Sequence, residues 1–335
     1  MNATVKSYYF SDKLSAFEYD RPESIEKAVD LLQKFKGSVK VMAGGTSLIS
    51  ALRLKIFPNY PERIISLKGI KDLKYIKEEA GVLKIGALTT LGNMLDNKLV
   101  NDSYKALVDA ALTSAPPQQR NLMTIGGEIC KDLYSWYIWN PNPRVRELNS
   151  DPKYLETDGM NQYLSIFGGA EVGYAINTSN IAVTLSALNA KIVTTQRTID
   201  IEEFYSGKTG STNNTVLNAD ELVKEIQIPK PDKKTKQIFM KVSYRKFIDS
   251  PLVSVAICAS MSGDIVENAR VFLGSVAPKP IRAAKAEEFL KGKKITADIA
   301  EKAGEEAVYG AKPLSRNAYK VKLSKVIVKR ALLAI

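Results

Sequence analysis

Two glycine pairs, each at the end of a short apolar run, constrain the fold of this chain more than any other feature. One pair lies in Val41–Leu48 (VMAGGTSL) and the other in Asn121–Glu128 (NLMTIGGE). Glycine lacks a Cβ, so its backbone adopts positive φ and lets a ligand approach closely. Successive exposed N–H groups in such turns bind anions, and a helix starting near Thr46 would add partial positive charge. The two loops therefore predict a clamp for the diphosphate of a dinucleotide cofactor.

The residue types that are missing or rare narrow the possible chemistry. The chain has no histidine, which excludes histidine-dependent triads, imidazole base catalysis, histidine metal sites and a flavin attached through histidine. Its two cysteines, Cys130 and Cys258, are too few for an iron–sulfur cluster held by four thiolates, and they favour a reducing cytoplasm over a disulfide framework. We therefore expect a bound cofactor to carry the chemistry, with no catalytic side chain and no metal ligand in this chain.

Composition and charge are typical of a soluble globular protein with two or three domains. Of the 335 residues, 45% are hydrophobic and 25% are charged. No apolar run approaches the roughly 20 residues of a membrane span, and the first residues lack the apolar core of a signal peptide, so we expect a cytoplasmic protein. The net charge of +12 is spread along the chain without interleaved aromatic residues. This pattern favours a solvated surface over nucleic-acid binding, which is the least favoured alternative.

The order of predicted elements indicates an α+β protein with three parts. Residues 1–57 and 58–229 each combine strands with helices, and residues 237–335 follow a linker that contains several lysines and two prolines. In the third part, three helices follow a predicted three-stranded antiparallel sheet, whose strands are Ile238–Tyr244, Val253–Ser262 and Ile265–Ser275.

Residues 131–170 differ in character from the rest of the chain. They contain both tryptophans, Trp136 and Trp139, and they lack a helical or strand period. Loops of this length are usually functional or covered by a partner. We expect an insert in the second part of the chain, whose aromatic side chains either form a small core of their own or cover a partner.

Neither glycine pair fits the common nucleotide-binding fingerprints. The Rossmann motif requires Gly-x-Gly-x-x-Gly between a strand and a helix, and the chain also has no Walker sequence. Several motifs instead resemble the FAD-binding medium subunit of molybdenum hydroxylases, the family of xanthine dehydrogenase and carbon monoxide dehydrogenase: Ala43–Leu48, Ile85–Thr90, Arg120–Gly127, Tyr244–Leu252 and Gly274–Arg282. The resemblance implies a PCMH-type FAD-binding domain made of two α/β subdomains, followed by a C-terminal domain of the carbon monoxide dehydrogenase flavoprotein type.

The insert adds a narrower resemblance. Its position after the second glycine pair is similar to that in the β subunit of 4-hydroxybenzoyl-CoA reductase, where an insert holds a [4Fe–4S] cluster through four cysteines. Residues 131–170 contain no cysteine, so we expect no such cluster here. The substrate and the electron acceptor of that enzyme therefore cannot be assigned to this chain from the resemblance.

The resemblance also implies a role for each matched position. Residues expected to wrap the pyrophosphate are Ala43, Gly44, Gly45, Thr46 and Ser47, and those expected to form the opposing wall are Thr124, Ile125, Gly126 and Gly127. Asn180 stands where the family usually has an aspartate that bonds the ribityl hydroxyls. Val223 and Lys241 match positions that line the adenine or the flavin, with a core residue and a strand-edge charge as the alternatives. Glu128 replaces a usual asparagine, so its carboxylate must point away from the diphosphate or meet a cation.

The function implied by the resemblance is electron transfer by an FAD-binding subunit. Such a subunit passes electrons between the [2Fe–2S] clusters of a ferredoxin-like small subunit and an external acceptor or donor, while molybdopterin lies on a large subunit, in a dimer of heterotrimers. One alternative is a standalone FAD-dependent oxidoreductase of the PCMH fold, which would react with a substrate alone. The other is a scaffold subunit that binds no flavin.

Overall fold

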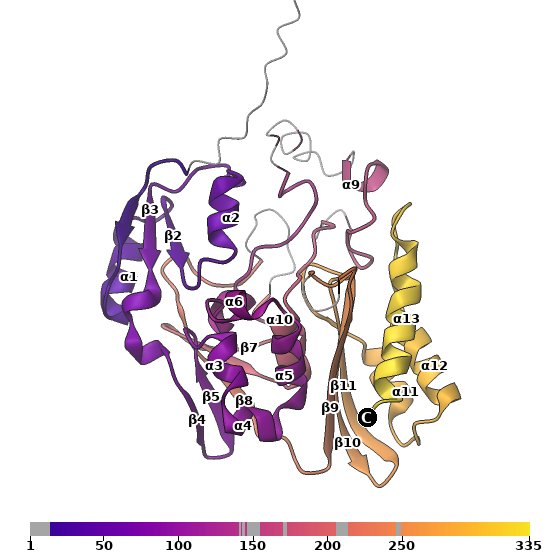
Figure 1. The fold of residues 1–335 in the computed structure, drawn as a ribbon. Helices are drawn as coiled ribbons and strands as arrows, with labels where there is room; N and C mark the ends of the chain where they lie inside the picture. Colours follow the sequence, from indigo (N-terminus) through magenta and orange to yellow (C-terminus); the bar gives the residue numbers. More distant parts are fainter. Residues whose placement is uncertain are drawn as a thin grey trace, which may run out of the picture.

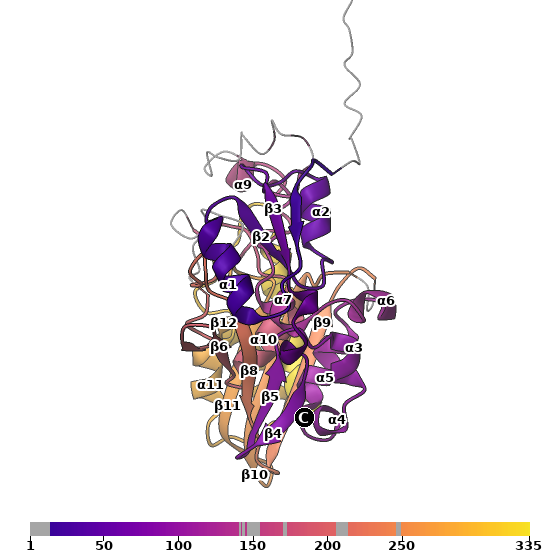
Figure 2. The ribbon, with the colours of Figure 1, turned by 90° about the vertical axis from the view of Figure 1, so that its left-hand side faces the viewer.

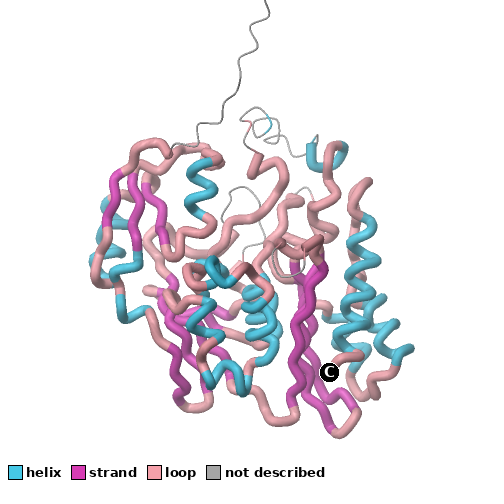
Figure 3. The backbone as a smooth tube through the Cα atoms, viewed as in Figure 1, coloured by secondary structure: helices cyan, strands magenta, loops and turns pink. Residues whose placement is uncertain are grey.

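The structure is a computed structural model that describes residues 14–140, 142, 145, 155–169, 173–205, 214–245 and 249–335. It contains three β-sheets that follow one another along the chain, and helices lie beside each sheet (Figure 1 and Figure 3). Among these described residues, no helix is both long enough and apolar enough to cross a membrane.

The N-terminal subdomain is a parallel three-stranded sheet, in the order β1-β3-β2, with one helix on each face (Figure 2). Its elements are β1 (Glu18–Asp20), α1 (Ile25–Lys34), β2 (Val39–Met42), α2 (Leu48–Arg53) and β3 (Arg63–Ser66), followed by the 3₁₀ turns Leu67–Gly69 and Lys71–Leu73. α1 begins after Ser24, whose hydroxyl accepts a hydrogen bond from the N–H of Lys27 at 3.3 Å. Leu32 of α1 packs with Ile65, whereas α2 packs with Ile64 on the opposite face of the sheet.

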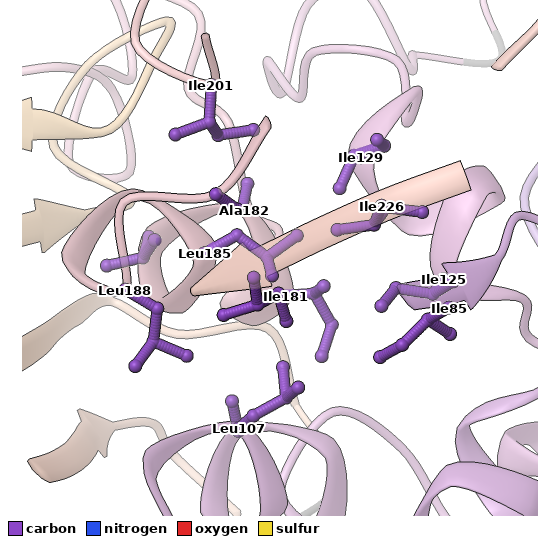
Figure 4. Packing of buried hydrophobic residues seen from close by; sticks show 14 of the residues in the cluster. Ile85, Leu107, Ile125, Ile129, Ile181, Ala182, Leu185, Leu188, Ile201 and Ile226 are labelled. Carbon is purple, nitrogen blue, oxygen red and sulfur yellow. The ribbon is translucent and has the colours of Figure 1, made fainter. Parts of the chain in front are cut away.

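The second subdomain is an antiparallel five-stranded sheet in the order β4-β5-β8-β6-β7. Its strands are β4 (Ile76–Glu79), β5 (Val82–Gly86), β6 (Lys191–Thr194), β7 (Thr198–Asp200) and β8 (Val223–Pro229). Its helices are α3 (Leu91–Leu95), α4 (Lys98–Ser103), α5 (Lys105–Leu112), α6 (Pro117–Arg120), α7 (Ile125–Ile129) and α10 (Asn180–Ala187). Figure 4 shows their shared core, in which Ile125 of α7 and Ile181 of α10 lie near Ile85 and Ile226 of the sheet.

The C-terminal sheet has four strands, in the order β12-β11-β10-β9, and not the three that the sequence predicted. Its strands are β9 (Thr235–Val242), β10 (Val253–Ser262), β11 (Ile265–Gly274) and β12 (Ile281–Arg282), and helices α11 (Ala284–Leu290), α12 (Ala297–Glu306) and α13 (Ala318–Leu332) follow. β12 pairs with β11 through only two residue pairs, Phe272 with Arg282 and Leu273 with Ile281. A strand of two residues is too short to show a period of two, so the sequence pattern could not reveal it.

Both faces of the C-terminal sheet are buried. Phe239, Ala256 and Phe272 lie opposite one another on adjacent strands and belong to the core of the second subdomain, beside α5 and α10. Val255 and Leu273 lie on the other face and pack in a separate core with α11, α12 and α13. The third part of the chain therefore shares its core with the second part.

The described parts of the insert contact both neighbouring subdomains. Trp139 packs against the core around Phe57 in the N-terminal subdomain, and its indole N–H donates to the carbonyl of Leu133 at 2.8 Å. Trp136 is 39% exposed and stacks on Tyr163. The short helix α9 (Leu155–Asp158) precedes the return of the chain toward α10. Trp139 thus packs outside the insert, whereas Trp136 stacks on another residue of the insert. Residues 141, 143–144, 146–154 and 170 of the insert lie outside the described residues.

Candidate functional site

A cavity of about 470 Å³ lies where the two glycine segments meet, within the size range of ligand sites, roughly 300–1,000 Å³. β2, the turn before β8 and the start of the insert complete its walls. The predicted site residues that line it are Ala43, Gly44, Gly45, Thr46, Ser47, Thr124, Gly126, Gly127 and Val223. Segments far apart in the sequence are therefore brought to one site.

The first glycine segment lines this cavity and has unpaired backbone N–H groups. Gly45 has a φ of +80°, a conformation that favours glycine. Helix α2 begins at Leu48, later than the predicted start near Thr46, and Ser47 makes no side-chain cap. Among the described residues, no acceptor takes the backbone N–H groups of residues 43–47. This bend supplies the donors that an anion requires.

Close packing joins the two glycine segments. A Cβ added at Gly44 would lie 2.0 Å from the carbonyl oxygen of Leu122, and one at Gly126 would lie 2.8 Å from that of Ala87. A Cβ at Gly127 would lie 3.8 Å from the Cβ of Ala43 on the first segment. The sequence analysis explained these glycines by the close approach of a ligand. In the structure, Gly44 and Gly126 are required because neighbouring backbone carbonyls leave no room for a Cβ.

The second glycine segment differs from the prediction, because its N–H groups already have acceptors. Thr124 caps α7 and accepts from the N–H of Gly127 at 3.1 Å. The N–H of Ile125 donates to the carbonyl of Thr89 at 3.0 Å, and that of Gly126 donates to the carbonyl of Ala87 at 2.9 Å. The Ile125 side chain is fully buried in the core and does not line the cavity. This segment forms a wall of the cavity, but it is not a second anion clamp.

Charged side chains next to this wall balance one another. Glu128 is 5% exposed, and its carboxylate lies 3.8 Å from the ammonium of Lys131, so it meets a cation, as the sequence required. Asp132 and Lys40 also line the cavity, and the Lys40 ammonium lies 4.5 Å from the ring centroid of Phe57. The sequence analysis missed Lys40, which lines the cavity together with Val39 and Val41 of the same strand.

Asn180 and Lys241 do not line this cavity. Asn180 is 3% exposed at the start of α10; its Nδ2 lies 3.4 Å from the hydroxyl of Ser114, and its Oδ1 has no partner among the described residues. The Lys241 ammonium donates to the carbonyls of Thr113 at 2.5 Å and Asp249 at 2.7 Å.

Lys241 is nevertheless coupled to the cavity through Lys131. Burial lowers the pKa of Lys241 to about 8; Asp249 opposes this shift, and the nearby Lys131 ammonium adds to it. Lys131 lines the cavity, whereas Lys241 lies outside its lining, beside the carbonyl of Thr113 that follows α5.

The turn before β8 is fixed by a buried carboxylate that sequence reasoning missed. Glu221 is 4% exposed and accepts from the N–H of Asn218 at 3.0 Å and from the Thr194 hydroxyl at 2.6 Å. Arg197 pairs with the same carboxylate at 3.1 Å. Burial raises the pKa of Glu221, but these three partners outweigh it and lower the pKa overall. Val223, next to this turn, is 7% exposed and lines the cavity, so it is both a core residue and a wall residue.

Comparison with known proteins explains this arrangement. Residues 15–231 match the family described as FAD binding domain in molybdopterin dehydrogenase. The chain belongs to this family. Residues 238–335 match the carbon monoxide dehydrogenase flavoprotein C-terminal domain. The predicted fold class, an FAD-binding domain followed by this C-terminal domain, is therefore confirmed.

Several relatives are named as medium chains or FAD-binding subunits of oxidoreductases. The glyceraldehyde dehydrogenase medium chain of Sulfolobus acidocaldarius is 29% identical over 84% of this chain and 84% of its own. The aldehyde oxidoreductase FAD-binding subunit PaoB of Escherichia coli is 29% identical over 93% of this chain and 96% of its own. A solved carbon monoxide dehydrogenase from Hydrogenophaga pseudoflava matches with a TM-score of 0.76 and 27% identity, covering 96% of this chain and 98% of the other. The chain is a component of an oxidoreductase, as the sequence predicted.

Proposed function

We propose that this chain binds FAD and transfers electrons as the medium subunit of a molybdenum hydroxylase complex. The observation that supports this most directly is the set of unpaired N–H groups at residues 43–47, which line a cavity of about 470 Å³. Membership of the FAD-binding family supplies the identity of the ligand. The medium-chain and FAD-subunit names of the relatives support its place in a larger complex.

The residues present fit an FAD molecule. The N–H groups from Ala43 to Ser47 would hold the diphosphate, with the hydroxyls of Thr46 and Ser47 as further donors. Gly126 and Gly127 would contribute a close wall, and Val223 an apolar surface for a ring. Bound FAD would supply the ability to exchange electrons singly or in pairs.

Two groups outside the lining of this cavity are proposed from the family resemblance to reach other parts of the cofactor: Asn180 the ribityl chain, and Lys241 the adenine or the flavin ring. The Oδ1 of Asn180 is a buried acceptor without a partner in the described structure, as expected of an atom that receives a hydrogen bond from a ligand. Lys241 would place a positive charge there. Lys131 would keep the Glu128 carboxylate from repelling the diphosphate.

The proposed partners follow from the family. They are a large subunit with molybdopterin and a ferredoxin-like small subunit with [2Fe–2S] clusters, assembled as a dimer of heterotrimers in the cytoplasm. The chain would pass electrons between those clusters and an external acceptor or donor. The narrower similarity to 4-hydroxybenzoyl-CoA reductase, without its [4Fe–4S] cluster, stays a prediction.

Replacing Gly45 by valine tests the diphosphate site. Gly45 and Gly81 both have positive φ, at +80° and +74°, but only Gly45 lines the cavity, since Gly81 lies in the hairpin between β4 and β5. Both substitutions incur the cost of a left-handed conformation, about 1–2 kcal/mol. We expect Gly45→Val to weaken FAD binding at least tenfold in a fluorescence titration, and Gly81→Val to leave it unchanged.

Equal FAD affinity in the two variants would contradict the placement of the diphosphate. Co-expression with candidate large and small subunits separates the remaining alternatives. A medium subunit co-purifies with both and shows no substrate turnover alone, whereas a standalone flavoenzyme reacts with its substrate without them. A scaffold would assemble with the two subunits yet take up no flavin.

A further inference from the structure

One hydrophobic core of the N-terminal subdomain contains a residue from another part of the chain. This core lies on the α2 face of the sheet, and we call it the α2 core; its buried members are Ala51, Leu52, Ile56, Phe57 and Ile64. Partly buried side chains pack against them, and among the described residues all of these but one lie between Phe17 and Tyr60. The exception is Trp139 of the insert. The insert therefore completes a core of the N-terminal subdomain.

Hydrogen bonds within the insert fix the position of Trp139. Its backbone N–H donates to the carbonyl of Ser135 at 3.0 Å, and its indole N–H donates to the carbonyl of Leu133 at 2.8 Å. Leu133 and Ser135 are both fully buried. Tyr134, between them, exchanges two backbone hydrogen bonds of 2.8 Å with Ile176, in the segment that leads to α10. The indole ring is thus anchored in the second subdomain while it packs in the first.

The α2 core also supports the bend of the first glycine segment. Met42 and Ile49 belong to this core, and a Cβ at Gly45 would lie 3.3 Å from the Met42 sulfur and 3.5 Å from Cγ1 of Ile49. The N–H of Ile49 donates to the carbonyl of Gly45 at 3.1 Å. Leu48 and Phe57 belong to the same core and line the cavity itself. A shift of the α2 core would therefore shift the bend and this part of the cavity wall.

The bend needs such support because its own backbone does little to hold its shape. The N–H groups of residues 43–47 are unpaired among the described residues, and Gly45 has a φ of +80°. Glycine has more accessible conformations than any other residue, and a diphosphate needs the N–H groups in one arrangement. Packing that holds a binding segment in its bound conformation lowers the entropy that the ligand must remove. The α2 core is the packing that can do this here.

Trp139 acts on the cavity from behind its wall. Lys131 and Asp132, at the start of the insert, line the cavity, whereas Trp139 does not. We propose that Trp139 is a positioning residue that holds the first glycine bend in the conformation that binds the diphosphate. This inference rests on the proposed FAD site and gives the insert a role in it. The insert, without the cysteines of an iron–sulfur cluster, links the two subdomains that enclose the cofactor.

Isothermal titration calorimetry of full-length variants with FAD and with ADP tests this role. Both ligands contain the diphosphate, so Trp139→Ala should weaken both by the same factor, about tenfold if one molecule in ten keeps the competent bend. Trp139→Phe keeps most of the apolar contact and should restore most of the affinity. Trp136→Ala is the matched control, because Trp136 is also in the insert but stacks on Tyr163 outside the α2 core; both affinities should be unchanged.

Hydrogen exchange of the full chain without FAD tests the support independently of any ligand. The N–H groups of Ile49 and Ala51 donate to the carbonyls of Gly45 and Ser47, at 3.1 and 3.0 Å. Trp139→Ala should make these two amides exchange severalfold faster, whereas the amides of α12 should keep their wild-type rates. A wild type that bound neither FAD nor ADP would contradict the proposed function, and the exchange rates would still decide whether Trp139 supports the bend.

Four results would overturn the proposal. Equal affinities of the wild type and Trp139→Ala, even with a lower melting temperature, would make Trp139 a purely structural residue. An equal loss in Trp136→Ala would show a general effect of the insert. Loss of FAD binding with unchanged ADP binding would mean that Trp139 acts on the flavin half. Unchanged exchange at residues 49 and 51 would remove the support itself. If Trp139→Ala does not fold, Trp139→Leu, which keeps part of the apolar contact, allows the same comparisons.

Discussion

The pH dependence of unfolding tests the buried ammonium of Lys320. Its side chain is fully buried on α13 and donates to the carbonyls of Tyr163 and Ser275, each at 2.8 Å. Burial lowers the pKa of Lys320 to about 7, whereas a lysine in an unfolded chain titrates at about 10.4. Between these two values the folded chain binds fewer protons than the unfolded chain. Raising the pH above 7 therefore favours the folded state.

The expected effect is large enough to measure. One titrating group changes the free energy of unfolding by at most about 1.4 kcal/mol per pH unit. Integrated from pH 7 to pH 9 with the two pKa values above, Lys320 adds about 2 kcal/mol of stability. Lys320→Met keeps the length of the side chain but removes the titration. It also loses two hydrogen bonds, a cost of about 1–3 kcal/mol each that does not vary with pH.

Urea unfolding at pH 7, 8 and 9, without added FAD and followed by circular dichroism, measures this difference. The stability of the wild type relative to Lys320→Met should rise by about 2 kcal/mol across the series. Lys241, whose pKa is about 8, is present in both proteins and cancels in the comparison. Lys322→Met removes an exposed lysine from the same helix and should follow the wild type. Parallel curves for the wild type and Lys320→Met would refute the reasoning.

Three further predictions concern the cavity. Glu128→Gln removes a carboxylate beside the diphosphate segment and should tighten FAD binding severalfold in a fluorescence titration; weaker binding would mean that Glu128 acts mainly by positioning Lys131. Lys241 loses its charge as the pH rises through about 8, so FAD affinity should fall between pH 7 and 9 in the wild type but stay level in Lys241→Met. Gly44→Ala should destabilise the chain by about 1–3 kcal/mol in urea, because its Cβ would lie 2.0 Å from the carbonyl oxygen of Leu122, and unchanged stability would disprove that contact.

Elements with strong local signals could be predicted closely. β10 has the predicted bounds Val253–Ser262, because a long and largely apolar run defines this strand. β12 and β1 could not be found in this way. β1 has three residues, Glu18–Asp20, and exists because it pairs in parallel with β3, which is distant in the sequence.

The candidate site could be located from the sequence but not understood in detail. Both glycine pairs have the same local signature, so the sequence assigned the same role to both. The difference arises from β5 and its continuation, where the carbonyls of Ala87 and Thr89 accept from the N–H groups of Gly126 and Ile125. Such long-range pairing has no signature in either segment. Lys40 was missed for the same reason, because its place in the wall depends on Phe57 and the neighbouring subdomain.

The unequal bonding of the two glycine segments determines where order is gained when a ligand binds. In the second segment the N–H groups of Ile125, Gly126 and Gly127 are paired within the folded chain, so its shape should not depend on FAD. The first segment has unpaired N–H groups and is the part that gains hydrogen bonds from a diphosphate. Because Gly44 packs on Leu122, that gain also strengthens the contact between the two subdomains. FAD should therefore protect the amides of residues 43–47 from hydrogen exchange more than those of residues 125–127.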